Sequence, residues 1–293
     1  MRLRKAPVLL LMCLLPSFGC GGGGMGSSSS PQPQPQFGHV FLLVEENHSY
    51  SEVIGSSSMP YLNSLASQGG LATQYFADVH PSIGNYFMLT TGLPKPIDDS
   101  FSGTVSDDNI VRELVKAGKS WKSYAESLPS VGDIGGDAYP YLHHHNPFSY
   151  LTDVIGTSQA QNLVPFSQFP SDLASGALPN FSFIVPNALD DAHDGSLTQA
   201  DAWLKNNIDS LVQSSTFKND GLLVIVFDES ELSDVEHGGG HVAAIIVSTK
   251  AKKGFQSQTF YQHQSTLRLM LSGLGVNNFP GASAVAPDMS EFF

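Results

Sequence analysis

The sequence predicts an α/β fold in which a mostly parallel central sheet carries helices on both faces. Continuous apolar runs of strand length recur along the chain, segments with helical spacing of apolar residues separate them, and polar clusters adjoin the runs. Unbroken apolar runs are typical of strands buried on both faces, and their alternation with helices is typical of parallel sheets. No internal repeat interrupts this pattern.

Four apolar runs are predicted to be strands, at residues 39–44, 181–185, 222–227 and 242–247. Polar residues adjoin each run: Glu45-Glu46-Asn47 after the first, Pro186-Asn187 after the second, Asp228-Glu229 after the third, and His237 to His241 before the fourth. Binding sites in parallel sheets gather at the carboxyl ends of the strands. We therefore expect one site where these polar clusters meet.

Helical spacing predicts helices at residues 110–115, 200–212 and 267–271, with a short fourth helix from Ser82 to about Gly92. Asp107 or Asp108 is predicted to cap the first of these, while Gly118 and Gly273 are predicted to end the first and the third.

The first 36 residues are predicted to lie outside the folded domain. Three basic residues precede an apolar stretch, residues 6–15, that is too short to span a bilayer and has the length of a signal-peptide core. Gly19-Cys20 then resembles the processing site of a bacterial lipoprotein, with ordinary cleavage as the alternative. We expect residues 1–20 to be a signal peptide and the protein to be exported, lipid-anchored at the cell envelope or else periplasmic or secreted.

Residues 21–36 are rich in Gly and Ser and then in Pro and Gln, which predicts a tether. Residues 37–293 contain no cysteine, so an exported domain there must be stabilised by core packing and a bound metal instead of disulfides. Loss of three basic residues with the signal changes the formal charge from −13 to −16. This charge disfavours nucleic-acid binding, and membrane contact is expected through the lipid anchor only.

Ser82 belongs to one of three polar clusters, and the other two supply carboxylates and an amide that suit a metal ion. Carboxylate and amide oxygens bind hard divalent cations, and nearby imidazoles extend the choice to zinc, manganese or iron. A divalent cation lowers the pKa of a coordinated hydroxyl, and the start of a helix offers N–H groups to a phosphate. The alternative for Ser82 is that it only caps its helix.

Several motifs carry a family resemblance. His80-Pro81-Ser82-Ile83-Gly84-Asn85-Tyr86, followed by Thr91-Gly92, resembles the nucleophile motif of the phosphoesterase family, which contains bacterial acid phosphatases and non-haemolytic phospholipases C and belongs to the alkaline-phosphatase-like superfamily. Other motifs stand in the family's order: Glu46-Asn47-His48, His145-Asn146-Pro147, Pro186-Asn187 with Asp190 to Gly195, Phe227-Asp228-Glu229, Gly240-His241-Val242 and His263-Gln264-Ser265.

The resemblance implies specific roles. The expected ligands of one divalent ion are Glu46, Asn47, Ser82, Asp228 and Glu229, with a second ion as an alternative. The expected catalytic residues are Ser82 as nucleophile and His145 or His241 as the proton donor to the leaving oxygen. Asn85, His193 and His80 are expected to bind substrate. Glu45 faces the opposite side of its strand from Glu46 and is expected to be supporting or structural.

The resemblance also implies the reaction: metal-dependent hydrolysis of phosphate esters, of the acid-phosphatase kind, through a phosphoserine at Ser82. The substrate is then a small phosphate ester or a phospholipid head group. Three alternatives remain: a phospholipase C-type phosphodiesterase, a non-catalytic ligand-binding surface lipoprotein, and a sulfate-ester hydrolase. The complete set of metal ligands argues against the binding protein, and the absence of cysteine from the domain argues against the sulfate-ester hydrolase.

Overall fold

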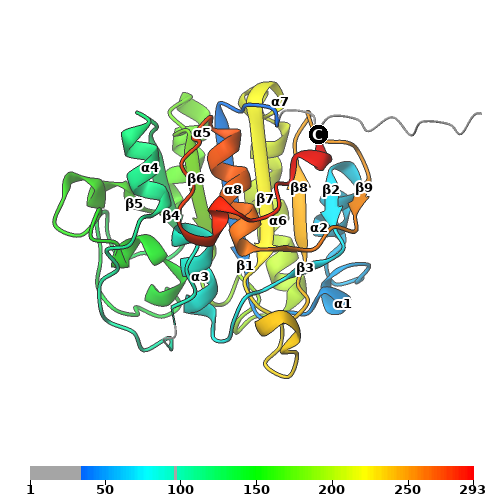
Figure 1. The fold of residues 1–293 in the computed structure, drawn as a ribbon, viewed down its shortest axis with the longest axis horizontal. Coiled ribbons are helices and arrows are strands. Elements are labelled where there is room, and N and C mark those ends of the chain that lie inside the picture. The colour runs from blue at the N-terminus through cyan, green and yellow to red at the C-terminus, as the bar shows by residue number, and fades with distance from the viewer. Residues whose placement is uncertain (1–33, 96–97) are drawn as a thin grey trace, which may run out of the picture. The chain divides into compact units, whose positions relative to one another are not determined.

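The computed structural model describes residues 34–95 and 98–293, and an eight-stranded sheet forms its centre (Figure 1). In spatial order the strands are β5 (Leu163–Pro165), β4 (Trp121–Ala125), β6 (Phe181–Val185), β1 (His39–Glu45), β7 (Gly221–Phe227), β8 (Ala244–Val247), β2 (Gly70–Ala72) and β9 (Phe255–Ser257). The first five are parallel, β8 is antiparallel to β7 and β2, and β9 is parallel to β2. The predicted α/β class with a mostly parallel sheet is confirmed.

Helices cover both faces of this sheet. On one face α3 (Ser82–Thr91), α4 (Ile110–Lys116) and α8 (His263–Gly273) pack together, and on the other α2 (Pro60–Gln68), α6 (Leu197–Gln213) and α7 (Ser215–Asp220) do. Figure 1 shows α8 in front of the strands and α6 behind them. The smaller elements are α1 (Tyr50–Val53), α5 (Phe169–Ser175), a separate pair of strands, β3 (Tyr75–Phe76) and β10 (Tyr261–Gln262), and 3₁₀ turns at His143–His145, Pro147–Tyr150, Ser158–Asn162, Phe166–Gln168, Glu236–Gly238, Gly281–Ala284 and Ser290–Phe292.

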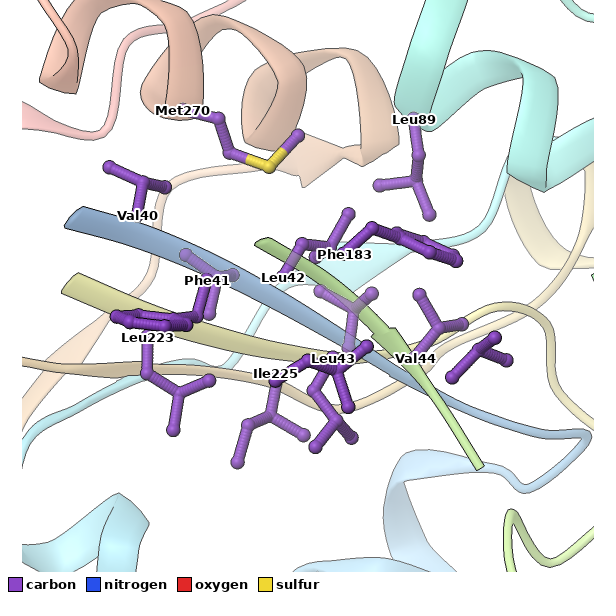
Figure 2. Close-up of a cluster of buried hydrophobic side chains, with 14 of the residues drawn as sticks. Val40, Phe41, Leu42, Leu43, Val44, Leu89, Phe183, Leu223, Ile225 and Met270 are labelled. Carbon is purple, nitrogen blue, oxygen red and sulfur yellow. The ribbon is translucent and has the colours of Figure 1, made fainter. Parts of the chain in front are cut away.

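The core lies against both faces of β1, since Val40 to Val44 are completely buried. Met270 of α8 and Leu89 of α3 lie on one side of the central strands, with Leu223 and Ile225 of β7 directed to the other (Figure 2). A parallel strand enclosed in this way needs apolar side chains at successive positions, which explains why the run has no polar alternation.

Three sequence-based details differ from the structure. The N-cap of α4 is Asn109, whose Oδ1 accepts the N–H of Arg112 at 3.0 Å, and neither Asp107 nor Asp108 caps the helix. Ser82 is the first residue of α3 and makes no capping bond, because Pro81 occupies the cap position. The sequence does not predict β2, β5 and β9, which have only three residues each, nor β3 and β10, which have two, nor β4, whose apolar run is interrupted by Lys122 and Ser123.

The end of the predicted tether belongs to the folded domain. Gln34 donates to the carbonyl of Leu269 and Gln36 to that of Ser272, both at 2.9 Å, near the end of α8. The predicted signal peptide at residues 1–20 and the tether up to residue 33 lie outside the described residues. Within the described part of the chain, no helix has the length and apolar character needed to cross a bilayer.

Helix α2 has no side-chain cap of its own, and Asp201 of α6 fills this role. Its carboxylate accepts the N–H groups of Tyr61 at 3.0 Å and Leu62 at 2.8 Å. We expect Asp201→Ala to lower the free energy of unfolding by about 1–2 kcal/mol, because two helix N–H groups lose their acceptor. Asn206→Ala, at an exposed position of α6, is the control and should cost less than about 0.5 kcal/mol in urea unfolding. Equal losses for the two variants would contradict this role for Asp201.

Candidate active site

Strand β1 and helix α3 bring Ser82 to Glu46 and Asn47 at the carboxyl edge of the sheet. The Ser82 hydroxyl lies 3.2 Å from Glu46 Oε2 and 3.4 Å from Asn47 Oδ1. Asn47 has a left-handed backbone (φ 56°), which Asn tolerates better than most residues, and its N–H donates to Asp228 Oδ1 at 3.1 Å. The hydroxyl of Ser82 is therefore directed toward acidic and amide groups and away from its own helix.

Glu46 and Asp228 lie close together without a lysine or arginine beside them in the described parts of the chain. Glu46 and Asp228 are completely buried, and no lysine or arginine in the described parts of the chain forms an ion pair with either. Burial raises the pKa of Asp228 to about 6, and burial together with the charge of Asp228 raises the pKa of Glu46. Asp228 Oδ2 is buried without a hydrogen-bond partner. Oxygen donors crowded in this way fit a divalent cation.

Glu229 lies beside this cluster and faces the turn that leads to Ser82. Its Oε2 is 3.2 Å from His80 Nδ1 and accepts a hydrogen bond from Asn85 Nδ2 at 3.3 Å. His80 Nε2 lies 2.9 Å from the carbonyl of Asp234. The ring of His80 thus lies between Glu229 and the loop after β7, where it supports the position of Glu229.

Asn85 is fully engaged within the protein. Its Oδ1 accepts the N–H groups of Asp78 and Val79, and its Nδ2 donates to the carbonyl of Val79 and to Glu229. An amide has two donor hydrogens and two acceptor positions, so no capacity is left for a phosphate in this arrangement. Asn85 lies in α3 and its side chain holds the turn before Ser82, whereas its motif predicts that it binds substrate.

A second group of donors shares Glu46. One ligand atom each of Glu46, His145 and Asp191 lies within 4.8 Å of the others, and all three residues are buried. His145 Nδ1 is 3.2 Å from Asp191 Oδ2 and 3.5 Å from Glu46 Oε1, while its Nε2 is buried without a partner. Burial lowers the pKa of His145 to about 3 and raises that of Asp191 to about 8. His145 therefore has an unused lone pair at Nε2 when Nδ1 carries the proton.

The other two predicted histidines occupy different surroundings. His193 is partly exposed, its Nδ1 lies 2.9 Å from Asp194 Oδ1, and its ring centre is 5.5 Å from that of His145. His241 is stacked between Tyr50 and Phe76, with ring centres 4.4 and 4.7 Å away. Its Nε2 lies 3.1 Å from the carbonyl of Thr73. Among the contacts of the described residues, the ring of His241 meets neither Ser82 nor the carboxylates around it.

His263 holds the segment that contains Asp228. Its Nε2 lies 2.6 Å from the carbonyl of Asp228 and its Nδ1 lies 3.0 Å from the Tyr75 hydroxyl, which in turn is 2.7 Å from Thr266 Oγ1. A carbonyl accepts only, so Nε2 carries the proton and Nδ1 accepts from Tyr75. Burial lowers the pKa of His263 to about 4, which keeps the ring neutral in this role.

Sequence reasoning missed two residues of the site. Tyr86 donates to Glu46 Oε1 and stacks on His145 with ring centres 5.4 Å apart. Asp191 accepts the N–H of His193 and contacts His145. Tyr86 could have been found because it lies four residues after Ser82, on the same helix face. Asp191 lies inside the middle motif, but its neighbours Asp190 and Asp194 are equally acidic, so spacing alone does not select it.

Glu45 is directed to the opposite face of the sheet from Glu46. It is completely buried, and neither carboxylate oxygen has a hydrogen-bond partner. Burial, reinforced by the charge of Asp191, raises the pKa of Glu45 well above its ordinary value of 4.5. An unpartnered buried carboxyl is more stable protonated, so Glu45 adds a pH-dependent cost to folding.

The chain matches the Phosphoesterase family over residues 56–277. It is 39% identical over 199 residues to a phosphatidylinositol-3-phosphatase of Mycobacterium tuberculosis, covering 67% of this chain and 64% of that one. It is 31% identical over 243 residues to a probable acid phosphatase of Kluyveromyces lactis, covering 79% of this chain and 56% of that one. The chain thus spans about six tenths of the length of these two relatives.

Solved structures with the same fold have low identity. A protein of the alkaline phosphatase superfamily from Vibrio parahaemolyticus superposes with a TM-score of 0.62 at 16% identity, covering 84% of this chain and 68% of the other. A lipoteichoic acid synthase from Listeria monocytogenes superposes with a TM-score of 0.57 at 12% identity, covering 83% and 74%. These likenesses concern the fold alone.

The surroundings of Glu45 give a pH prediction. Its carboxyl holds a proton more tightly in the folded than in the unfolded chain, so its contribution to stability is complete below pH 4.5 and is lost as the pH rises toward its raised pKa. Above pH 4.5 we expect the free energy of unfolding of Glu45→Gln to rise relative to that of the natural chain, by up to about 1.4 kcal/mol per pH unit. Urea unfolding in chelator at pH 5, 6, 7 and 8 measures it. A constant difference would show that the carboxyl is not neutral in the fold.

Proposed function

The chain belongs to the phosphoesterase family, and we propose that it is a metal-dependent hydrolase of phosphate esters with Ser82 as its nucleophile. One observation carries the proposal: the Ser82 hydroxyl lies 3.2 Å from Glu46 and 3.4 Å from Asn47, in a cluster of buried carboxyl groups that no lysine or arginine of the described residues pairs with. A helix cap alone does not require such surroundings.

Glu46, Asn47, Asp228 and Ser82 would hold the ion, with Glu229 adjoining from the side of His80. A bound divalent ion supplies positive charge that compensates the carboxylates and stabilises negative charge on the reacting oxygens. Glu46, His145 and Asp191 are a second set of donors that shares Glu46. A metal count on the purified protein distinguishes one ion from two.

The residues of the chain then have defined tasks. Ser82 Oγ releases its proton to solvent and bonds to phosphorus while the bond from phosphorus to the leaving oxygen breaks. His193 donates a proton to that oxygen, since it is partly exposed, adjoins His145 and has Asp194 2.9 Å from its Nδ1. The oxygen of a water molecule then bonds to phosphorus and gives one proton back to His193, while the bond from phosphorus to Ser82 Oγ breaks and Ser82 recovers a proton from solvent. Of the histidines expected to serve as acid, His145 is enclosed by carboxylates and His241 is stacked elsewhere.

Two relatives suggest substrates for this chain. The names of the relatives, an acid phosphatase and a phosphatidylinositol-3-phosphatase, both specify phosphate monoesters. We propose monoesterase activity ahead of the phospholipase C-type alternative. Parallel assays with p-nitrophenyl phosphate, bis-p-nitrophenyl phosphate and a soluble phosphatidylinositol 3-phosphate separate a general monoesterase, a phosphodiesterase and a phosphatase of phosphoinositide head groups. The predicted export and lipid anchor belong to the same proposal and are tested by mass spectrometry of the N-terminus and of Cys20.

Ser82→Ala tests the nucleophile. We expect a loss of at least about 10³-fold in kcat, because no other group can form the covalent intermediate.

Asp228→Asn should weaken both metal affinity and turnover, because it removes a charged donor. Both variants are assayed with p-nitrophenyl phosphate, and metal affinity is measured by calorimetry on chelated protein. Full activity of Asp228→Asn without bound metal would contradict the proposed reaction.

His193→Gln tests the proton donor through the leaving group. An alkyl phosphate needs protonation of its leaving oxygen far more than p-nitrophenyl phosphate does, so we expect about a 10²-fold loss of kcat with the former and little loss with the latter. His237→Gln, an exposed histidine paired with Glu236, is the control. Equal losses with the two substrates would assign His193 to binding instead of proton transfer.

A further inference from the structure

A carboxylate from a distant loop lies across the start of the helix that carries Ser82. Asp99 Oδ1 accepts the N–H of Ile83 at 3.1 Å, and Ile83 directly follows Ser82. The cap residue of α3, Pro81, supplies no side-chain acceptor. Asp99 therefore acts as the acceptor at a helix start, which is also the place where such a helix attracts a phosphate.

The charge of Asp99 acts on groups on both sides of Ser82. Burial and the charge of Asp228 are the main causes of the raised pKa of Glu229, and the charge of Asp99 adds to them. The charge of Asp99 also acts to raise the pKa of His144 and His145, but burial dominates there and lowers it. Glu229 contacts the turn before Ser82, whereas His145 adjoins Glu46. Asp99 therefore binds the N–H of the residue next to Ser82 and lies within electrostatic reach of groups on both of its flanks.

No cation compensates Asp99 within the described residues. Lys95, on the same segment, is paired with Asp107, and Asp98 accepts from Ser100. Arg112 is paired with Asp153 and Asp108. Any phosphate that reaches Ser82 thus meets a negative carboxylate beside it.

We propose that Asp99 is a specificity-determining residue that makes the site select the singly charged, protonated form of a phosphate monoester. The P–OH of that form donates a hydrogen bond to the carboxylate, whereas the doubly charged form has no such hydrogen and is repelled. The second pKa of a phosphate monoester is about 6, so the favoured form predominates in acid. This inference rests on the proposed hydrolysis of phosphate esters, and it predicts a preference for acid that arises from the substrate's ionisation.

Asp99→Asn separates charge from capping. The amide oxygen of Asn still accepts the N–H of Ile83, while the negative charge is gone. Asp98→Asn is the matched control, because it removes the same charge one residue away from an exposed side chain without contact to α3. Both variants are compared with the natural chain by kcat/KM from pH 4.5 to 8.

For p-nitrophenyl phosphate we expect Asp99→Asn to raise kcat/KM about tenfold at pH 7.5 and to change it little at pH 5, because only the doubly charged substrate is repelled. Asp98→Asn should follow the natural chain. For bis-p-nitrophenyl phosphate, which has one charge and no P–OH at every pH used, the effect of Asp99→Asn should not depend on pH. If this diester turns over too slowly, it is used as a competitive inhibitor.

The Ser82→Ala protein provides a readout without turnover. Binding of p-nitrophenyl phosphate to its metal-loaded form, measured by calorimetry, should tighten at pH 7.5 when Asp99→Asn is added and remain similar at pH 5. An unchanged pH profile for the monoester, or an equal pH-dependent gain for the diester, would overturn the role of Asp99. Failure of the natural chain to hydrolyse any phosphate ester with metal bound would instead overturn the proposed function, so the two failures are distinguishable.

Discussion

The arrangement of the site depends on the register between β1 and β7. Glu45 pairs with Phe227, and the N–H of Asp228 donates to the carbonyl of Glu45 at 2.9 Å, so the polar residues that follow the two strands emerge side by side. Side chains alternate between the faces of a strand, and a slip of one residue would turn Glu46 toward α6 and Glu45 toward Ser82. Because the strands are apolar and buried on both faces, such a slip would cost core packing against both layers of helices.

A second set of contacts fixes the nucleophile relative to those strand ends. Asn85 holds the turn at Asp78 and Val79 and also reaches Glu229. Asp78 accepts the N–H of His263, whose ring donates to the carbonyl of Asp228. The start of α3, the start of α8 and the end of β7 are thus joined by hydrogen bonds between buried and half-buried groups. Such bonds are strong where water is excluded, which lets the serine keep its position beside groups that repel one another.

The sequence allowed the main part of the site to be predicted for a physical reason. In a parallel sheet the ends of neighbouring strands meet, so Glu46 and Asp228 could be brought together from the apolar runs alone, and the motif around Ser82 supplied the third group. His241 marks the limit of this reasoning. It precedes an antiparallel strand and therefore lies at the same edge, but its ring packs between Tyr50 and Phe76, and sequence spacing does not give the direction of a side chain.

Residues brought from distant loops were outside that reasoning altogether. Asp99 is one of several acidic residues in a polar segment, and only the folded chain shows that it meets the N–H of Ile83. Glu45 differs from its neighbour Glu46 only in the face it occupies, yet one carboxyl adjoins Ser82 and the other has no partner. Buried carboxyl groups of this kind disfavour the folded chain at neutral pH, and a cation bound at the cluster would relieve that cost for Glu46 and Asp228 but not for Glu45. The repulsion at Glu46 and Asp228 therefore affects both the stability in chelator and the affinity for metal. The cost of burying Glu45 affects stability alone, because Glu45 lies on the other face of the sheet.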